Sequence, residues 1–454
     1  MPLEKDQAGG AILIYGEIMK LKDLLDPSKT YRVKPSKRLG EGAQGEVTLI
    51  DGFENNPSSY ALKLYHCPPS TPQGQHLIHF VQYIRSQGQL KASPSLPLPL
   101  WAVEEEDEHR VGCIMRLISG RPLDSSLYHD LYTHPNGIRA RLCAARSLAE
   151  TVATLHRYQI VSADIADPNL HLDLNSLMVF HTDLDGGGIL GSPLDNHFQL
   201  APLVRGHFEG SSMAPELIQN ERLFASIASD RWSLAVALHK LLFAGLDPYF
   251  ALDTYQEAVE NPTNWPVRQA PSVSHQKYIP FHAEEYLRLG PLLQQRFTSV
   301  FHHTVAQWEP ELRPRAEDWL RNLEIALEWV QSCPYCKQEI IFEGLQTCPL
   351  CHQRWRAPVV WTKQVCVPLD RQGKSLLGID LGFTDRNGRY VVAVFGRRSG
   401  RVCLFPQVPI FDQDRHKQYD PYQSVMIDQR SNVASFFARS GDGHQQAEFR
   451  IQTL

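Results

Sequence analysis

The periodicity of hydrophobic and polar residues changes along this chain. From Tyr31 to about Leu117, short apolar runs with a period of two predict β-strands, as in the segments YRVKPSKRL, EVTLIDGF and SYALKLY. Helical spacing of apolar residues appears over 76–87 and dominates beyond Gly120. It predicts further helices over 138–158, 231–243, 284–301 and 315–330. Strands followed by helices are the order of an α+β fold.

The two ends of the chain differ from this middle region. Residues 1–30 are interpreted as a short leader in which Ile18–Leu25 forms a turn or two of helix. From Val359 onward period-two strands return, and hairpin turns are predicted at TDRNGR (384–389) and RRSGR (397–401). The pattern predicts a small all-β domain over 357–454.

Composition narrows the class of protein. The chain has 454 residues, of which 43% are hydrophobic and 21% charged, and its net charge is −5. This length predicts two or three domains. No apolar segment approaches the roughly 20 residues that span a bilayer, and no signal peptide is evident, so a cytoplasmic protein without a membrane partner is expected. Cys67, Cys113 and Cys143 are interpreted as reduced core thiols.

A glycine pattern and a lysine carry the first chemical signal. Gly40, Gly42 and Gly45 form G-x-G-x-x-G between two predicted strands, with Val47 directly behind. Glycines there let backbone amides approach anionic oxygens. Lys63 follows in a strand that is otherwise apolar, beside Ala61, where a buried charge requires a partner. ATP phosphates are such a partner, so these residues are predicted to bind a nucleotide.

With these features the chain resembles the eukaryotic-type protein kinases, and the resemblance covers about residues 31–325. Asp164 and Asn169 keep the D-x-x-x-x-N spacing of the catalytic loop. The resemblance implies that Asp164 accepts the proton of the substrate hydroxyl, and that Asn169 and Asp183 hold Mg²⁺ or Mn²⁺. Asp185, in the sequence Asp-Leu-Asp, is the rival of Asp183 for the metal.

Three further matches imply structural roles. Glu216 ends the sequence Met-Ala-Pro-Glu, which resembles the kinase A-P-E motif, and the resemblance pairs it with Arg313. Asp230, in the sequence SDRWSL, is expected to brace the catalytic loop. Met115 falls at the gatekeeper position, and Arg116–Ile118 fall where the hinge meets adenine.

The resemblance implies a bilobal kinase-like fold and a domain plan for the whole chain. Its predicted parts are a leader at 1–30, a kinase-like domain at 31–330 with an N-lobe at 31–118 and a C-lobe at 119–330, a zinc ribbon at 331–356 and a small all-β domain at 357–454.

The pattern departs from the family at the lysine. No acidic residue occurs between Lys63 and Glu104, so the helix predicted over 76–87 brings no glutamate to pair with Lys63. Gln75 or Gln82 is the substitute at that point. An uncharged amide is expected to grip the ammonium more weakly than a carboxylate.

The catalytic loop also departs from the family. Ser162 and Ala163 stand where the family has histidine and arginine, and Ala166 replaces a lysine. Switching by a phosphorylated activation loop therefore loses its usual arginine anchor. The favoured hypothesis is an ATP- and magnesium-dependent kinase that phosphorylates Ser or Thr hydroxyls of a partner protein. A Tyr hydroxyl is the alternative acceptor. A nucleotide-binding pseudokinase scaffold is the alternative.

Four cysteines form two tight pairs. The chain reads Cys333-Pro-Tyr-Cys336 and Cys348-Pro-Leu-Cys351, the spacing of a structural zinc ribbon. Disulfides are disfavoured in a cytosolic chain. Because the segment is too short to build a core, zinc is expected to hold its fold. Such ribbons dock proteins or nucleic acids, and docking of a protein is favoured. A nucleic-acid or protein adaptor is the second alternative function.

At the level of the whole chain a narrower resemblance is present. The segments SADIADPN (162–169) and DLDG (183–186), together with a zinc ribbon, look like bacterial Ser/Thr kinases of the triads linked to tellurite resistance. Those kinases accompany a metal-dependent protein phosphatase and a von Willebrand A-domain protein. The resemblance implies that proteins of these two kinds are the partners.

Overall fold

The structure is a computed structural model that describes residues 17–42, 44–51, 53, 60–90, 93, 95–191, 199–205, 212–248, 285–301, 309–333, 335–341, 347–353, 359–362, 366–368, 374–381, 390–398, 401–427, 433–440 and 443–452. The predicted turn at 384–389 lies outside these residues. The fold is mixed α+β, as the sequence predicts. It divides into two compact units, Met1–Ala283 with Gln295–Glu324 and Glu284–Gln294 with Ile325–Leu454.

The first unit begins with a closed barrel whose strands follow the order β1-β2-β3-β4-β6-β5. Its strands are β1 Met19–Asp23, β2 Thr30–Gly42, β3 Gly45–Asp51, β4 Tyr60–Tyr65, β5 Pro99–Glu105 and β6 Val111–Arg116. Inside the barrel the ring of Phe53 meets three other rings edge-on, with centroids 4.8–5.1 Å away. Closure pairs every strand on both sides, so this sheet has no open edge.

Strand β1 corrects the prediction for the N-terminal segment. Residues 18–25 are not helical, because Met19, Leu21 and Asp23 are buried while the lysines between them are exposed. This alternation is that of a strand. Strand β1 pairs with β2 and with β5, so the described part of the predicted leader belongs to the barrel.

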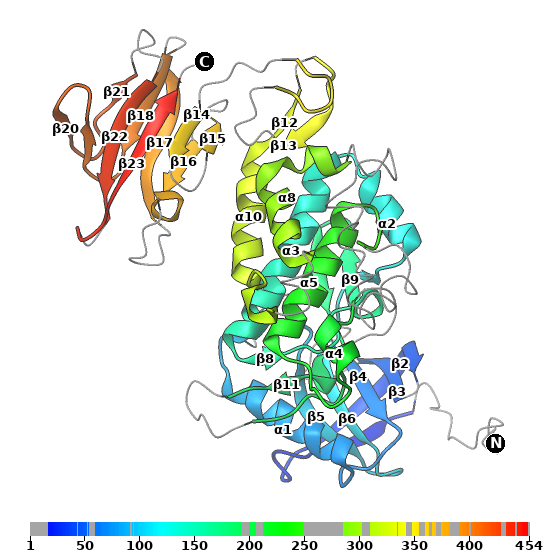
Figure 1. Ribbon diagram of the computed structural model, residues 1–454. Helices are drawn as coiled ribbons and strands as arrows, with labels where there is room; N and C mark the ends of the chain where they lie inside the picture. Colours follow the sequence, from blue (N-terminus) through cyan, green and yellow to red (C-terminus); the bar gives the residue numbers. More distant parts are fainter. Residues whose placement is uncertain are drawn as a thin grey trace. The chain divides into compact units, whose positions relative to one another are not determined.

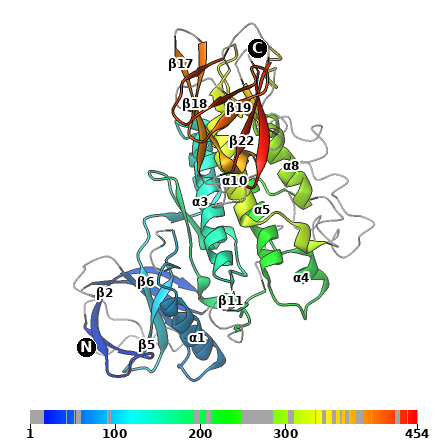
Figure 2. The same cartoon turned by 90° about the vertical axis from the view of Figure 1, so that its left-hand side faces the viewer.

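Helix α1 (Pro72–Ser86) packs on the outside of the barrel. Thr71 caps it by accepting the N–H of Gly74 at 3.1 Å, and proline occupies its first turn. Its buried residues Leu77 and Val81 join a hydrophobic cluster with side chains of β4, β5 and β6. Figures 1 and 2 show α1 alongside β5.

The rest of the first unit is mainly helical and lies beyond the barrel in both views (Figures 1 and 2). The helices that follow α1 in the described chain include α2 Ser125–Tyr132, α3 Gly137–Arg157, α4 Pro215–Gln219, α5 Ile227–Leu242, α8 Gly290–Phe301 and α10 Ala316–Trp329. Of α8 and α10, residues 295–301 and 316–324 belong to the first unit. Helix α5 is buried along most of its length. It begins four residues earlier than predicted because Ser226 and Ser229 form a capping box.

Short strands connect the segment before α2 with the loops between α3 and α4. A three-stranded sheet has the order β10-β9-β7, and β11 pairs with β8. These strands are β7 Arg121–Pro122, β8 Ile160–Val161, β9 Leu170–Asp173, β10 Met178–His181 and β11 Gly188–Ile189. Single turns of 3₁₀ helix lie at Asp167–Asn169 and Leu184–Gly186.

The second unit contains the cysteine pairs and the C-terminal strands. A hairpin of β12 (Val330–Ser332) and β13 (Glu339–Ile341) precedes two antiparallel sheets with the orders β15-β14-β23-β22-β19-β20 and β16-β17-β18-β21. Their strands are β14 Val359–Thr362, β15 Cys366–Pro368, β16 Lys374–Leu377, β17 Val391–Arg398, β18 Arg401–Pro406, β19 Ile410–Asp412, β20 Lys417–Tyr419, β21 Val425–Met426, β22 Val433–Arg439 and β23 Gln446–Gln452. The hairpin predicted at 397–401 is confirmed by the pairing of Arg398 with Arg401.

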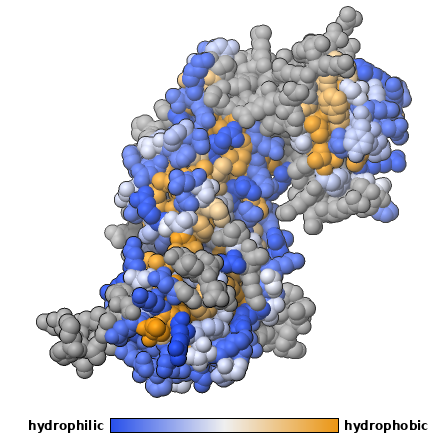
Figure 3. Space-filling model, turned by 180° about the vertical axis from the view of Figure 1, so that it is seen from behind, coloured by the Kyte–Doolittle hydropathy of each residue, from blue (hydrophilic) through white to orange (hydrophobic). Residues whose placement is uncertain are grey.

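Hydrophilic residues cover most of the coloured surface in Figure 3. Within the part of the chain that the structure describes, no helix is both long and apolar enough to cross a membrane.

Candidate functional site

A cavity of about 460 Å³ lies in the first unit, beneath the β2–β3 hairpin. Every residue predicted to bind the nucleotide lines it, together with the predicted metal ligands. These residues are Gly40, Gly42, Gly45, Val47, Ala61, Lys63, Met115, Ile118, Asn169 and Asp183. The structure thus brings the residues of the sequence-predicted site together around one space.

The three glycines of the hairpin have different surroundings. A Cβ added at Gly45 would lie 2.1 Å from the carbonyl oxygen of Leu64, so no side chain fits there. A Cβ at Gly40 or Gly42 would meet no described atom within 4 Å. Packing therefore explains why glycine is needed at Gly45 but not at the other two positions. Gly40 and Gly42 leave the cavity rim clear of side chains.

Lys63 projects from β4 toward the aspartates of the segment 183–187. Its Nζ bonds to Asp183 and lies 3.0 and 3.2 Å from the two carboxylate oxygens of Asp185. The expectation that Gln75 or Gln82 would hydrogen-bond to Lys63 is wrong. Both glutamines are exposed, and Gln75 donates to the carbonyl of Pro69 instead.

The two aspartates occupy different environments. The side chain of Asp183 is 46% exposed and lines the cavity, whereas that of Asp185 is 7% exposed and accepts a bond from the Tyr65 hydroxyl. Asp183 also has a left-handed backbone, with φ 58°. Aspartate tolerates this conformation better than most residues, and such strain gathers at functional sites. Of the two rivals, Asp183 is the one open to a ligand.

Charge pairing governs the protonation of this group. Burial acts to lower the pKa of Lys63, but the charges of Asp185 and Asp183 outweigh it and raise that pKa. Burial acts to raise the pKa of Asp185, and the attraction of Lys63 with the Tyr65 hydrogen bond brings it below its usual value. Burial and the neighbouring Asp185 raise the pKa of Asp183. Lys63 is therefore a cation at neutral pH.

Asp164 and Asn169 meet as the spacing predicts. The Asn169 Nδ2 donates to Asp164 Oδ2 at 2.8 Å and to the Asp164 carbonyl at 3.2 Å. Thr182 donates from its N–H and its hydroxyl to the carbonyl of Asn169, at 2.8 and 3.1 Å. Because Thr182 precedes Asp183, these bonds fasten the loop of Asp164 to the loop of the aspartate pair. The amide oxygen of Asn169 and the carboxylate of Asp183 are donors of the kind that Mg²⁺ prefers.

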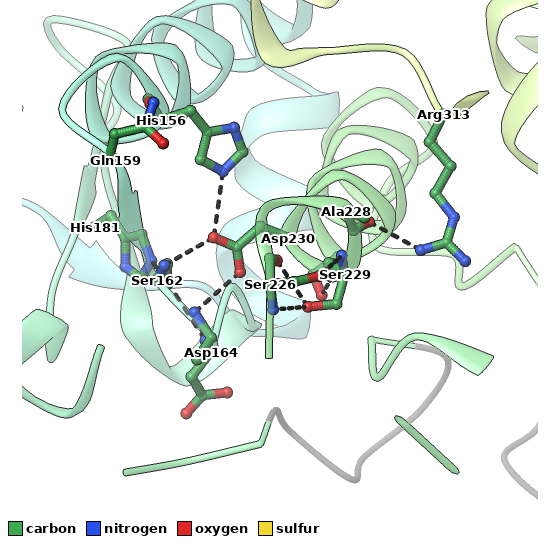
Figure 4. A network of polar contacts seen from close by, with 12 residues as sticks. His156, Gln159, Ser162, Asp164, His181, Ser226, Ala228, Ser229, Asp230 and Arg313 are labelled. Carbon is green, nitrogen blue, oxygen red and sulfur yellow. Dashed lines mark hydrogen bonds and ion pairs between the residues drawn. The ribbon is translucent and has the colours of Figure 1, made fainter. Parts of the chain in front are cut away.

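Asp230 braces this loop from α5, as Figure 4 shows. Its carboxylate accepts the backbone N–H of Ser162 at 2.7 Å and of Ala163 at 2.9 Å, and it accepts from His156 Nε2 at 3.2 Å. Ala163 has φ 66°, which is costly for a residue with a Cβ. Asp230 holds the loop in that conformation, and the Asp164 carboxylate points away from Asp230 in Figure 4.

A second long-range pair fastens α4 to the segment before α10. Both terminal nitrogens of Arg313 bond to the carboxylate of Glu216, at 2.8 and 2.7 Å. The Arg313 side chain is fully buried, and it also donates to the carbonyl of Ala228 at 2.9 Å. The predicted partners Glu216 and Arg313 are thus in contact, in the two-pronged geometry that is strongest for arginine.

The sequence reasoning missed one support of the loop that carries Asp164. Asp167 accepts from the Tyr128 hydroxyl at 2.9 Å and pairs with Lys240 of α5 at 3.2 Å. It also overlooked Tyr65 and His76. The signal for Tyr65 was available, since it lies two residues after Lys63 on the same face of β4. No sequence signal indicates the contacts of Asp167, which depend on how α2 and α5 pack.

The four paired cysteines converge in the second unit. Their sulfur atoms all lie within 4.8 Å of one another, with Cys333 to Cys351 at 3.7 Å and Cys336 to Cys348 at 3.9 Å. Four sulfurs held about 2.3 Å from one zinc ion in a tetrahedron are about 3.8 Å apart. A disulfide needs about 2.05 Å. The cluster therefore fits a metal ion, and the predicted ligand set is confirmed as a group.

The two cysteine pairs have the same backbone. In the first, the N–H of Cys333 donates to the carbonyl of Gln338, and in the second that of Cys348 donates to Gln353, both at 2.9 Å. The residue after each second cysteine is left-handed, with φ 62° at Lys337 and 58° at His352. Each knuckle is thus a closed turn that presents two sulfurs from one side. Arg354, Trp355 and Arg356, which follow the second pair in the sequence, lie outside the described residues.

Comparisons with known proteins add no relative to this picture: neither the family models nor the curated protein sequences yield a match for the chain.

Proposed function

We propose that this chain is an ATP- and Mg²⁺-dependent protein kinase that phosphorylates Ser or Thr hydroxyls of a partner protein. The observation that carries the proposal is the meeting of Lys63 with Asp183 at the wall of a cavity that the glycine hairpin covers. Asn169 lines the same cavity and is bonded to Asp164. A lysine for phosphates, two metal ligands and a base around one space are the parts that phosphoryl transfer needs.

The architecture supports the proposal as well. A barrel with one attached helix precedes a helical part, and the cavity residues come from both. We propose that this is the bilobal kinase fold. The contacts of Asp230 with the backbone of the Asp164 loop, and the pair of Glu216 with Arg313, agree with the roles that the kinase resemblance assigns to them. These pairs join residues 68 and 97 positions apart in the sequence.

In this proposal Asp164 orients the acceptor hydroxyl and takes its proton. The hydroxyl oxygen bonds to the γ-phosphorus of ATP while the bond to the ADP oxygen breaks. Asn169 fixes the carboxylate of Asp164 through its Nδ2, and Lys63 binds phosphate oxygens. Magnesium, held by Asn169 and Asp183, would neutralise phosphate charge when bound. Gly40 and Gly42 line the cavity with no side chain of their own, so phosphates could approach the hairpin backbone there.

The departures from the family suggest how the enzyme differs from its relatives. Asp230 holds the backbone on both sides of the Ser162–Ala163 bond, so the loop does not depend on an arginine before Asp164 for its shape. The family lysine replaced by Ala166 has no direct substitute on the loop. Lys240 lies near it, but its charge is taken up by Asp167. We propose an enzyme that needs no phosphorylated activation loop.

We propose further that the cysteine cluster holds a structural Zn²⁺ and that its unit docks partner proteins. The partner kinds are those of the bacterial triads, a metal-dependent protein phosphatase and a von Willebrand A-domain protein, in the cytoplasm. Zinc held by four thiolates leaves no open position for catalysis, so its role is to hold the two knuckles together.

Transfer of labelled phosphate from ATP tests the proposal. Wild type should phosphorylate itself or a candidate partner, and Asp164→Asn should lower the rate at least about a hundredfold, because it removes the proton acceptor. Asp130→Asn, a change at an exposed ion pair with Arg121, is the matched control and should leave transfer unchanged. Nucleotide binding without any transfer would refute the kinase and favour the pseudokinase scaffold.

A further inference from the structure

The pairing of Lys63 raises a question that the sequence could not answer. A buried ammonium needs a fixed carboxylate, and α1 has no acidic residue with which to supply one. The structure shows two carboxylates at Lys63, both from the segment between β10 and β11. One of them, Asp183, lines the cavity, whereas Asp185 does not line it and contacts Lys63 from its buried side.

Asp185 is held as a fixed group. Its side chain is 7% exposed, and both of its carboxylate oxygens lie within hydrogen-bond distance of Lys63. The Tyr65 hydroxyl donates to it from two residues further along β4. Lys63 and Tyr65 thus hold Asp185 from neighbouring positions of one strand. Asp183, at 46% exposure and at the cavity wall, has the access that a metal ligand requires.

We infer that Asp185 is the positioning residue for Lys63, and that it does the work for which an acidic residue on α1 would otherwise be needed. This inference rests on the proposed function. It assigns the two aspartates to separate tasks: Asp185 holds the lysine toward the phosphates, and Asp183 binds the metal when nucleotide is present. The lysine and its carboxylate are then assembled by β4 and one loop, with no contribution of charge from α1.

Helix α1 is connected to the same loop by a different contact. His76, buried on α1, bonds through Nε2 to the carbonyl of Gly187 at 2.9 Å, and its ring stacks on Phe80 of the same helix. This bond is to the backbone rather than to Lys63. Gly187 belongs to the loop that carries Asp185, and Phe80 of α1 packs in one cluster with Leu184 of that loop. Helix α1 therefore supports the loop by packing and by one backbone bond, and Asp185 supplies the charge.

Binding of ADP by the full chain, measured by calorimetry with and without Mg²⁺, separates the two tasks. Asp185→Asn should weaken binding about tenfold in both conditions, since a neutral amide holds Lys63 less firmly. Asp183→Asn should leave binding without metal within about twofold and should abolish the gain that Mg²⁺ gives. Tyr65→Phe should reproduce the effect of Asp185→Asn in weaker form. Gln75→Ala, on the exposed face of α1, is the control and should bind as wild type does.

Amide hydrogen exchange supplies a readout that needs no nucleotide. Asp185→Asn should speed exchange across 183–189, because the loop loses its hold on β4, and Gln75→Ala should not. An Asp185→Asn variant that loses only the Mg²⁺ effect would reverse the assignment, and one that behaves as wild type in both measurements would overturn it. Faster exchange in this variant, when wild type binds no nucleotide, would refute the proposed function while the pairing stands.

Discussion

The lysine site of the first unit and the cysteine site of the second hold charge in opposite ways. Lys63 is buried, and two aspartates more than offset its charge without any ligand. The cysteine cluster brings four sulfur atoms within 4.8 Å of one another, and thiolates at that distance repel unless a cation lies among them. The first site thus holds its cation in the absence of a ligand, whereas the second would need a metal ion to hold four thiolates together.

This difference has a consequence for how each site depends on the fold. The aspartates reach Lys63 across 120 and 122 residues of sequence, so the pairing depends on tertiary packing of the first unit. The cysteines come from two adjacent knuckles whose shape is set by local backbone bonds. Folding therefore creates the lysine site, whereas the proposed zinc ion would hold the two preformed knuckles together.

The largest effect is expected from the loss of a zinc ligand. Cys348→Ser should reduce bound zinc from about one per chain to nearly none, since three thiolates hold zinc far less tightly than four. Metal analysis and limited proteolysis at 333–351 measure this. Cys143→Ser, a half-buried thiol of α3, is the control and should keep its zinc. If Cys348→Ser also unfolded the first unit, the contrast between the two sites would fail.

A large effect on the first unit is expected at its buried ion pair. Arg313→Met leaves the carboxylate of Glu216 without its partner and should lower the free energy of unfolding by about 3–5 kcal/mol. Arg121→Met removes an exposed pair with Asp130 and should cost less than about 1 kcal/mol. Urea denaturation of both variants gives the comparison. Equal losses would mean that long-range pairs do not hold this unit together, and zinc content should be unchanged in both.

The same contrast explains what the sequence could predict. The cysteine cluster could be predicted because the spacing of its cysteines fixes the local turns. The residues around the cavity could be predicted because their order along the chain resembles that of a known family. The partner of Lys63 could not be predicted. Gln75 and Gln82 were plausible by their distance along the chain, but only the packing of α1 decides which of its residues face inward. Strand β1 was missed because four alternating residues, M-K-L-K, are too few to separate a strand from a helical turn.

A third effect is the pH dependence of the stability of the first unit, which a buried histidine should produce. Burial lowers the pKa of His181 to about 4, although Asp230 acts in the opposite direction. In the unfolded chain the same histidine has a pKa near 6.5. Between these two pKa values the unfolded state binds a proton at His181 and the folded state does not. The free energy of unfolding therefore falls as the pH is lowered from 6.5 to 4. The loss attributable to His181 should be about 3 kcal/mol.

The measurement for His181 is the free energy of unfolding at several pH values for wild type and His181→Asn. The variant should show a shallower fall between pH 6.5 and 4, whatever its absolute stability. Loss of zinc at low pH is common to both proteins and cancels in the difference. Identical slopes would mean that His181 is protonated in the folded state and that the first unit tolerates an unmatched charge there.

The smallest effect distinguishes packing from ligand access within the glycine hairpin. Gly45→Ala places a Cβ against the carbonyl of Leu64 and should destabilise the first unit by about 1–3 kcal/mol. Gly40→Ala meets no described atom, so it should change stability by less than about 0.5 kcal/mol. If the hairpin covers phosphates, Gly40→Ala should still weaken ADP binding severalfold, because its methyl group intrudes where the amides approach the ligand. Urea denaturation and calorimetry on the two variants separate these roles. A Gly40→Ala protein that binds ADP as wild type does would mean that the hairpin at Gly40 does not contact the nucleotide.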